Sequence, residues 1–549
     1  MAEATVVVAS YRPFAAIAVS GVAALLILLS ARRPTIREGW TIAAALAKFG
    51  LVLSMIPDAL AGREHVTDLG TLVPGVEFAF RADPLGLLFG VVASGLYVAT
   101  AIYSVGYLRG LGGSEQTRFF AALAASLSAT IGVAFATNLL VLFLFYELLT
   151  VATYPLVAHE ETHEARRAGY KYLAYALSGG VLVVLGTLLV FWLAGTVTFA
   201  PGGIDGIAAV AGADPWFVRV VFGFLVVGFG VKAAIMPLHP WLPSAMVAPT
   251  PISGLLHAVA VVKSGVFGIA RTVLDVFGPE TIGALGVGLP LAVAAAATML
   301  LGSLIALRQD DLKRLLAYST IAQLSYIVLG LALVSPAAIA GGLLHLPAHA
   351  FAKLTLFFCA GALYVELQLK SISELAGVGR RMPLTMTAFA IGAFSMAGIP
   401  LFAGFVSKWY LIVGGLSAEQ LLVPIVLVLS GLLNVAYFWP IVYAAFFESP
   451  ERADPKPIVE GPIGGNSPAS IEEGARTDGG GGPSDCGGGP KTAGFDRSDW
   501  RGGETTWLLL GPILATAGLV VLFGIAVEWL FFADAARSIV ESATGVALP

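Results

Sequence analysis

The chain has 549 residues, of which 57% are hydrophobic and 12% are charged, and its formal net charge is −4. Soluble globular proteins carry about 25% charged residues, so this composition excludes an ordinary soluble domain and indicates a chain whose solvent is lipid. Only two cysteines occur, which excludes a disulfide framework, an iron–sulfur cluster and a cysteine-based zinc site. Walker A, GxGxxG and HExxH motifs are absent, so we expect no ATP hydrolysis, no metal and no cofactor.

Apolar runs predict an all-α polytopic membrane protein of about fourteen transmembrane helices, since roughly 20 apolar residues cross the hydrocarbon core. The predicted helices are 12–31, 41–58, 84–107, 119–136, 138–158, 169–195, 216–236, 249–274, 284–307, 314–334, 336–365, 384–413, 418–446 and 506–533. The first lacks the basic region and cleavage site of a signal peptide, so we expect it to be retained. Residues 447–503 are rich in Gly, Pro, Ser and Asp, which predicts a disordered cytoplasmic loop.

Lysine and arginine are unevenly distributed between these helices. With both termini outside a plasma membrane, the inner loops hold twenty of the 31 basic residues and the outer segments hold six, as the positive-inside rule requires. The remaining five are lysines within predicted helices, and no arginine joins them: Lys48, Lys232, Lys263, Lys353 and Lys408. A desolvated lysine releases its proton readily whereas a guanidinium stays charged, so this pattern favours proton carriers.

Glu147 lies in the apolar helix 138–158. A lone carboxylate there costs at least ~2.5 kcal/mol on insertion scales, so we expect it to be neutral or paired, and functional rather than a structural hydrogen bond. Lys232, five residues before Pro237, is the expected partner. Movement of Glu147 would then switch Lys232 between holding and releasing a proton.

Three titratable side chains share one face of helix 336–365. His345, His349 and Lys353 are spaced four apart and span about 12 Å of helical rise. Pro347 loosens the turn between the histidines, and histidine can pass a proton from one ring nitrogen to the other. This stripe predicts a proton relay.

The other buried polar residues are judged singly. Lys263 is too deep to reach either interface, so we expect a function, whereas His257 fits a relay and a helix–helix hydrogen bond equally. Lys408, eight residues after Pro400, is the expected exit-side carrier in a broken helix. Lys48 lies only about 12 Å from its helix start, so we expect it to snorkel to the interface.

Long segments of the chain, in order, resemble the antiporter-like subunits shared by Mrp-type multisubunit Na+/H+ antiporters and respiratory complex I. The resemblance covers most of residues 80–445 and is carried by FRADPLGLLF, YSVGYLRG, FYELLTVATYPLV, VKAAIMPLHPWLPSAMVAPTPISGLLHAVAVVKSGVFG, DLKRLLAYSTIAQLSY, HAFAKLTLFFCAGAL and GIPLFAGFVSKWYL. It implies two inverted five-helix repeats, each with one broken helix, at 111–275 and 276–446. Residues 1–110 would precede them, and the loop 447–503 and the last helix, within 504–549, would follow.

The same resemblance implies roles for eight residues. Glu147 and Lys232 would form the coupled pair and Lys408 the terminal carrier. The central relay would be formed by Lys263, His345, His349 and Lys353. His239, after Pro237, matches a histidine present in some members. His257 is a ninth candidate, from its place in an apolar helix and not from the resemblance.

Three functions stay open at this point. The first is the proton-translocating subunit of a multisubunit monovalent cation (Na+)/H+ antiporter. The second is a proton-pumping membrane subunit of a complex I-like NADH/quinone oxidoreductase or membrane-bound hydrogenase, with the redox chemistry in other chains. The third is a scaffold with a vestigial relay. The expected partners are other subunits, the bilayer, protons and Na+, without nucleic acid.

Overall fold

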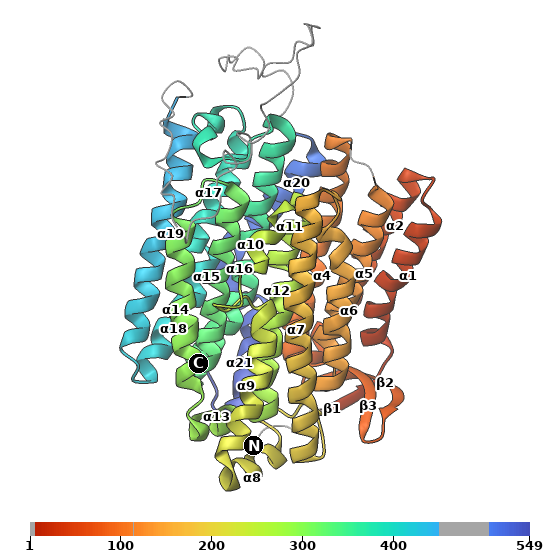
Figure 1. Cartoon of the computed structure of the whole chain (residues 1–549), viewed down its shortest axis with the longest axis vertical. Coiled ribbons are helices and arrows are strands. Elements are labelled where there is room, and N and C mark those ends of the chain that lie inside the picture. Colours follow the sequence, from red (N-terminus) through yellow and green to blue (C-terminus); the bar gives the residue numbers. More distant parts are fainter. Residues whose placement is uncertain (1–5, 113–114, 450–503, 549) are drawn as a thin grey trace, which may run out of the picture.

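The computed structural model describes residues 6–112, 115–449 and 504–548, and most of them belong to one bundle of helices that run along its long axis (Figure 1). The first half contains α1 (Arg12–Leu29), α2 (Pro34–Leu53), α3 (Ile56–Leu60), α4 (Pro84–Leu111), α5 (Gln116–Phe135), α6 (Leu139–Val157), α7 (His163–Ala194), α8 (Asp205–Ala213), α9 (Pro215–Lys232), α10 (Trp241–Ser244), α11 (Thr250–Ala258) and α12 (Val261–Arg271). The second half contains α13 (Pro279–Leu285), α14 (Gly288–Ala306), α15 (Leu312–Ala332), α16 (Pro336–Leu367), α17 (Pro383–Ala397), α18 (Ala403–Ser417), α19 (Leu422–Phe447), α20 (Trp507–Ala526) and α21 (Phe531–Thr544).

Within the described ranges, thirteen of the fourteen predicted crossings are matched by a helix that is long and apolar enough to cross a membrane. The predicted helix 384–413 is divided into α17 and α18, which flank the break at residues 398–402. The prediction of a polytopic all-α protein is therefore confirmed, and the remaining predicted helix is present as two shorter helices.

The prediction was wrong about the continuity of helix 249–274. The backbone leaves the helical path at Val259 and Ala260, which separate α11 from α12. A short π-helix, Thr272–Phe277, then extends α12. The β-branched residues around the break lower helix propensity, and complete burial in the bundle lets packing decide the local path.

A small sheet at one end of the bundle is absent from the sequence prediction. It consists of β1 (Val6–Ala9), β2 (Arg63–Val73) and β3 (Val76–Ala82), in the order β1-β2-β3. The β1 and β2 strands are parallel, and β2 and β3 form an antiparallel hairpin, with Gly75 at φ +83° in the turn. The hairpin leads directly into α4 and so fixes where that helix begins.

Helix α16 forms the centre of the molecule. Every residue from Ala338 to Leu363 is buried, because α16 packs against α4, α11, α15, α17, α18, α20 and α21. A helix that is apolar on every face except one narrow titratable stripe is stable only when it is enclosed in this way. The amphipathic α21, which the sequence prediction missed, covers one side of α16.

The predicted disordered loop 447–503 lies almost entirely outside the described residues.

Candidate functional site

Four of the five predicted interior lysines share one arrangement. Each is buried, and each ammonium nitrogen donates to a main-chain carbonyl of another helix. For Lys232, Lys263, Lys353 and Lys408 in turn, the acceptors are the carbonyl oxygens of Tyr146, of Leu346 at 3.1 Å, of Leu316 at 3.0 Å and of Met396 at 2.6 Å. No ion pair within the described ranges involves these lysines. A carbonyl dipole holds an ammonium without a counter-charge, so the amine can lose its proton without leaving an unpaired carboxylate behind.

Glu147 and Lys232 are neighbours but do not form the expected ion pair. Lys232 contacts the residue before Glu147, since it donates to the Tyr146 carbonyl and lies 3.2 Å from the centroid of the Tyr146 ring. Consecutive helix residues are about 100° apart around the axis, so Glu147 faces another direction. Its carboxylate packs against α7, where a Cβ on Gly180 would clash with Oε1. Neither carboxylate oxygen has a hydrogen-bond partner among the described residues.

Lys263 connects the two halves of the molecule. It stands on α12 and donates to the Leu346 carbonyl of α16, beside His345. The backbone of α12 also touches the end of α9, because a Cβ on Gly265 would clash with the amide nitrogen of Ala233. Only glycine allows this approach, and it places the helices of Lys232 and Lys263 side by side.

His345 is the most highly connected residue of the α16 stripe. Its Nδ1 lies 2.8 Å from the Ser407 hydroxyl and its Nε2 lies 3.0 Å from Oε1 of Gln323. The amide nitrogen of Gln323 donates to the Met396 carbonyl at 3.2 Å, which is also the acceptor of Lys408. The Tyr326 ring lies between them, stacked on His345 at 5.1 Å and 4.7 Å from the Lys408 nitrogen. His345 and Lys408 are therefore joined through one side chain and one carbonyl.

A second chain of hydrogen bonds joins Lys353 to the same carbonyl. Lys353 donates to Ser319 at 2.8 Å, and the hydroxyls of Ser319 and Tyr437 are 3.1 Å apart. Tyr437 donates to the side-chain oxygen of Asn434, whose amide nitrogen donates to Met396 at 3.2 Å. Lys353 and Lys408 are thus the ends of a continuous path through Ser319, Tyr437 and Asn434.

Sequence reasoning missed these neutral residues. Ser319 and Gln323 are four apart on α15, and Asn434 and Tyr437 are three apart on α19, so each pair occupies one helix face. That spacing could have indicated a polar path in the sequence. However, a neutral polar pair in an apolar helix is equally typical of simple helix–helix hydrogen bonding.

The remaining predicted histidines have fewer contacts. His257 and His349 are completely buried, and neither ring nitrogen of either residue has a hydrogen-bond partner in the described part of the chain. The His349 ring lies 6.2 Å from that of His345, and the His257 ring lies 4.9 Å from that of Phe357. His239 is half-buried in the segment between α9 and α10, and its ring lies 6.3 Å from that of Tyr318.

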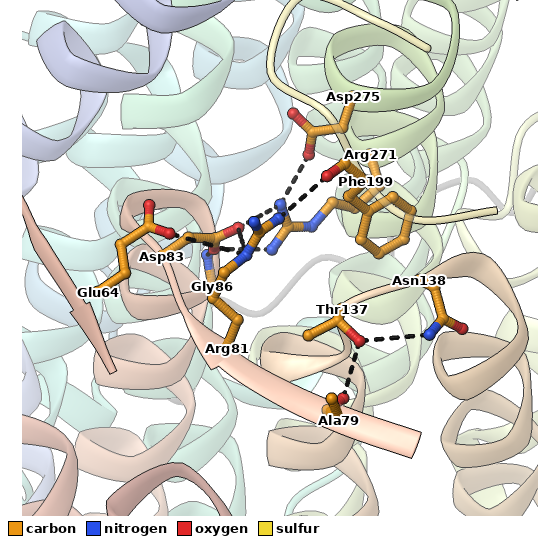
Figure 2. A network of polar contacts seen from close by, with 10 residues as sticks. All are labelled: Glu64, Ala79, Arg81, Asp83, Gly86, Thr137, Asn138, Phe199, Arg271 and Asp275. Carbon is orange, nitrogen blue, oxygen red and sulfur yellow. Dashed lines mark hydrogen bonds and ion pairs between the residues drawn. The ribbon is translucent and has the colours of Figure 1, made fainter. Parts of the chain in front are cut away.

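Two buried arginines contradict the expectation that interior basic residues are all lysines: Arg37 on α2, which is 4% exposed, and the more deeply buried Arg271. Arg271 lies on α12 and is 2% exposed. It donates to Asp83 at 2.7 and 2.8 Å and to Asp275 at 2.7 Å (Figure 2). Two carboxylates therefore compensate the guanidinium, which makes its burial tolerable. Asp83 begins α4, so this ion pair holds α12 to α4 at the end of the bundle that carries the sheet.

Arg81 extends this cluster to the sheet. Its Nε lies 3.8 Å from both Asp83 and Glu64, the latter on β2 (Figure 2). Burial, assisted by the nearby charge of Asp83, raises the pKa of Glu64 to about 7, although Arg81 and Arg271 act in the opposite direction.

Comparison with known proteins identifies the family. The family model described as NADH:quinone oxidoreductase/Mrp antiporter, TM, matches residues 136–433, which is more than half of the chain. NADH-quinone oxidoreductase subunit N of Desulforudis audaxviator is 35% identical over 381 residues, covering 68% of this chain and 73% of the relative. A probable K+/H+ antiporter protein of Rhizobium meliloti is 31% identical over 401 residues, covering 71% of this chain but only 38% of that longer protein.

A solved structure agrees with the fold. A chain of the Mrp complex from Dietzia sp. DQ12-45-1b superposes with a TM-score of 0.78 at 23% identity, covering 97% of each chain. From these matches, the chain belongs to the NADH:quinone oxidoreductase/Mrp antiporter transmembrane family.

Proposed function

We propose that this chain is the proton-translocating membrane subunit of a multisubunit monovalent cation/proton antiporter, with Na+ as the exchanged cation. The observation that carries the proposal is the hydrogen-bonded path from Lys353 to Lys408, in a bundle where four buried lysines are held by carbonyls without a counter-ion among the described residues. The hydroxyls of Ser319 and Tyr437 both donate and accept, so they can pass a proton, whereas the Met396 carbonyl only accepts and therefore positions Lys408 rather than relaying the proton to it.

The proposed order of transfer follows the helices. Glu147 and Lys232 form the first station, Lys263 the second, the His345–His349–Lys353 stripe the third and Lys408 the last. In each step one amine or imidazole releases a proton and the next accepts it. Approach of ionised Glu147 to Lys232 would favour the protonated lysine, and its withdrawal toward Gly180 would favour release.

Transport by the assembled complex tests this proposal. The complex would be reconstituted in vesicles and proton movement followed after addition of Na+, K+ or Li+. We expect Lys232→Ala and Glu147→Ala to abolish cation-dependent proton movement, whereas Lys370→Ala, at an exposed lysine, should match the wild type. If the Lys232→Ala complex assembles and keeps full transport, the relay is vestigial and the chain is a scaffold.

A second candidate function is supported by the comparisons. The oxidoreductase subunit N of D. audaxviator is the relative of which this chain covers 73%, a larger share than it covers of the R. meliloti antiporter protein. In that case the chain would pump protons in a redox-driven complex. Co-purification with iron–sulfur and quinone-binding subunits, and proton pumping driven by an electron donor without added Na+, would favour this candidate.

A further inference from the structure

Lys48 differs from the other four interior lysines. Its side chain is 0% exposed, so the expectation that it snorkels to the interface is wrong. Its nitrogen has no hydrogen-bond partner among the described residues, and the ring of Tyr97 on α4 lies 5.9 Å away. A cation–π contact at this distance gives some stabilisation, but an ammonium at this depth also needs an acceptor.

Two other buried polar atoms face the same seam between α2 and α4. The hydroxyls of Tyr97 and Ser104 are buried without a hydrogen-bond partner in the described ranges. They are seven residues apart on α4 and so lie on one face, the face that carries the Tyr97 contact with Lys48. Buried polar atoms are nearly always satisfied by protein or by ordered water, so three such atoms along one seam indicate water between the helices.

The seam leads to one surface of the protein. Glu38, Thr41, Ala45 and Lys48 lie on one face of α2, and Lys48 is about 15 Å from Glu38 at 1.5 Å of rise per residue. Arg109 donates to Glu38 from α4, with Nε at 3.3 Å, and its side chain is 53% exposed. Because α2 and α4 are antiparallel, Ser104 lies between this ion pair and Tyr97.

The ionisable groups around Lys48 are few. The helices packed against α2 are α1, α4 and α5. Their ionisable side chains are Arg12, Tyr97, Tyr103, Tyr107, Arg109 and Arg118. None of these is a carboxylate. On α2 itself, Arg37 and the Glu38 carboxylate are ionisable, and Glu38 is about 15 Å from Lys48 and paired with Arg109, so water and the Tyr97 ring are the groups near the Lys48 amine.

We propose that Lys48 is a protonatable site at the inner end of a hydrated half-channel between α2 and α4, which opens beside Glu38 and Arg109. The positive-inside distribution places this opening on the cytoplasmic side. The Lys48 amine accepts a proton from a hydronium ion in the half-channel, leaving water, and returns it to water in the reverse step. The site lies outside the relay of Glu147, Lys232, Lys263, the α16 stripe and Lys408. Its role in loading protons rests on the proposed function, but its hydration does not.

Thiol labelling tests the hydration directly. In a background with Cys359→Ser and Cys486→Ser, a single cysteine is introduced as Lys48→Cys, Ser104→Cys or Val52→Cys. Val52 is equally buried and lies one turn farther along α2, beyond the proposed end of the half-channel. The probe is methanethiosulfonate ethylammonium, applied separately to each side of reconstituted vesicles.

We expect the cysteines at positions 48 and 104 to react from the cytoplasmic side at least roughly tenfold faster than the one at 52, because reaction requires a hydrated thiolate. Ser104→Cys keeps Lys48 and so provides the test even if Lys48→Cys does not fold. Equal rates at positions 104 and 52, or faster labelling from the outer side, would overturn the half-channel.

Proton transport by the full complex tests the role of the amine. We expect Lys48→Met to slow proton movement by roughly tenfold and to change its pH profile, since a general acid–base group is lost. Leu46→Met, at an exposed position of the same helix, should leave both unchanged. Wild-type rate and pH profile in Lys48→Met would refute the loading role. If Lys232→Ala also transports protons normally, the proposed function is refuted. The labelling rates still show whether the half-channel is hydrated.

Discussion

The contact between a buried lysine and a main-chain carbonyl is the recurring feature at the scale of single residues. An ion pair would fix each lysine in its charged form, because removal of the proton would strand a buried carboxylate. A carbonyl carries no net charge, so loss of the lysine proton leaves no unpaired charge behind. Lys263, Lys353 and Lys408 can therefore alternate between the protonated and neutral forms at a lower cost in free energy.

Tyr437 provides a specific test of the path between Lys353 and Lys408. Tyr437→Phe removes only the hydroxyl that contacts Ser319 and Asn434. Loss of a hydrogen-bonded link worth about 1.4 kcal/mol should slow proton transport about tenfold. Vesicle transport measures the effect, and Tyr443→Phe, at an exposed position of the same helix, should transport normally. An unchanged rate in Tyr437→Phe would show that protons bypass this hydroxyl.

Glu64 makes stability depend on pH. Its pKa is about 7 in the folded protein and about 4.3 in an unfolded chain, so the folded state binds the proton more tightly. The resulting stabilisation is present below about pH 4 and is lost as the pH rises through about 7.

We therefore expect Glu64→Gln, which resembles the protonated acid, to leave stability unchanged at pH 4.5 and to raise it at pH 8, by on the order of 1–3 kcal/mol. Thermal unfolding of the purified protein at the two pH values measures the difference. Glu77→Gln, at an exposed position of the same hairpin, is the control. An equal gain at both pH values would contradict the assignment.

Only the ionisable residues of the site were predictable from the sequence. Lysine, glutamate and histidine in an apolar helix are costly, so their presence alone indicates function. Burial of a neutral polar side chain costs little free energy once the side chain is hydrogen-bonded. This holds for Ser319, Gln323, Asn434 and Tyr437, whose hydrogen bonds depend on helices far apart in sequence. The direction of Glu147 was also beyond prediction, because it depends on how α6 is rotated against α7.

At the scale of secondary-structure elements, the structure contains interruptions that composition does not reveal. The break between α17 and α18 was expected from Pro400, whereas the break between α11 and α12 contains neither Pro nor Gly. The β-hairpin was missed because its alternating pattern is short and lies between stronger apolar runs. Helix α21 was missed because 14 residues with one polar face do not resemble a membrane crossing.

We expect the ion pairs of Arg271 to be the main interaction that holds α12 against α4. Arg271→Met would leave Asp83 and Asp275 buried without their cation, which should lower the free energy of unfolding by about 3–5 kcal/mol. Thermal unfolding in detergent measures the loss, and Asp275→Asn added to Arg271→Met should recover part of it. Arg32→Met, at an exposed arginine, should be nearly neutral. A small loss in Arg271→Met would mean that helix packing alone holds α12 in place.

At the scale of the whole molecule, thirteen of the fourteen crossings were predictable because lipid imposes one strong rule, a long apolar helix for each crossing. The division into repeats at 111–275 and 276–446 stays a prediction. So does the orientation, which rests on the distribution of lysine and arginine.

The orientation can be tested with two exposed positions at opposite ends of the bundle. With both native cysteines replaced by serine, Glu77→Cys in the hairpin should be labelled in intact cells by a membrane-impermeant thiol reagent. Lys370→Cys should be labelled only after the membrane is opened, because the positive-inside rule places its loop in the cytoplasm. The reverse pattern would invert the topology.

The Met396 carbonyl receives hydrogen bonds from Lys408, Gln323 and Asn434 at the last turn of α17. Carbonyls in the last turn of a helix lack helical partners and form its partially negative end. An acceptor made of backbone survives any replacement of the methionine side chain. Alanine scanning would therefore overlook the atom on which both branches converge, and only changes that restore the helix across residues 398–402 would remove it.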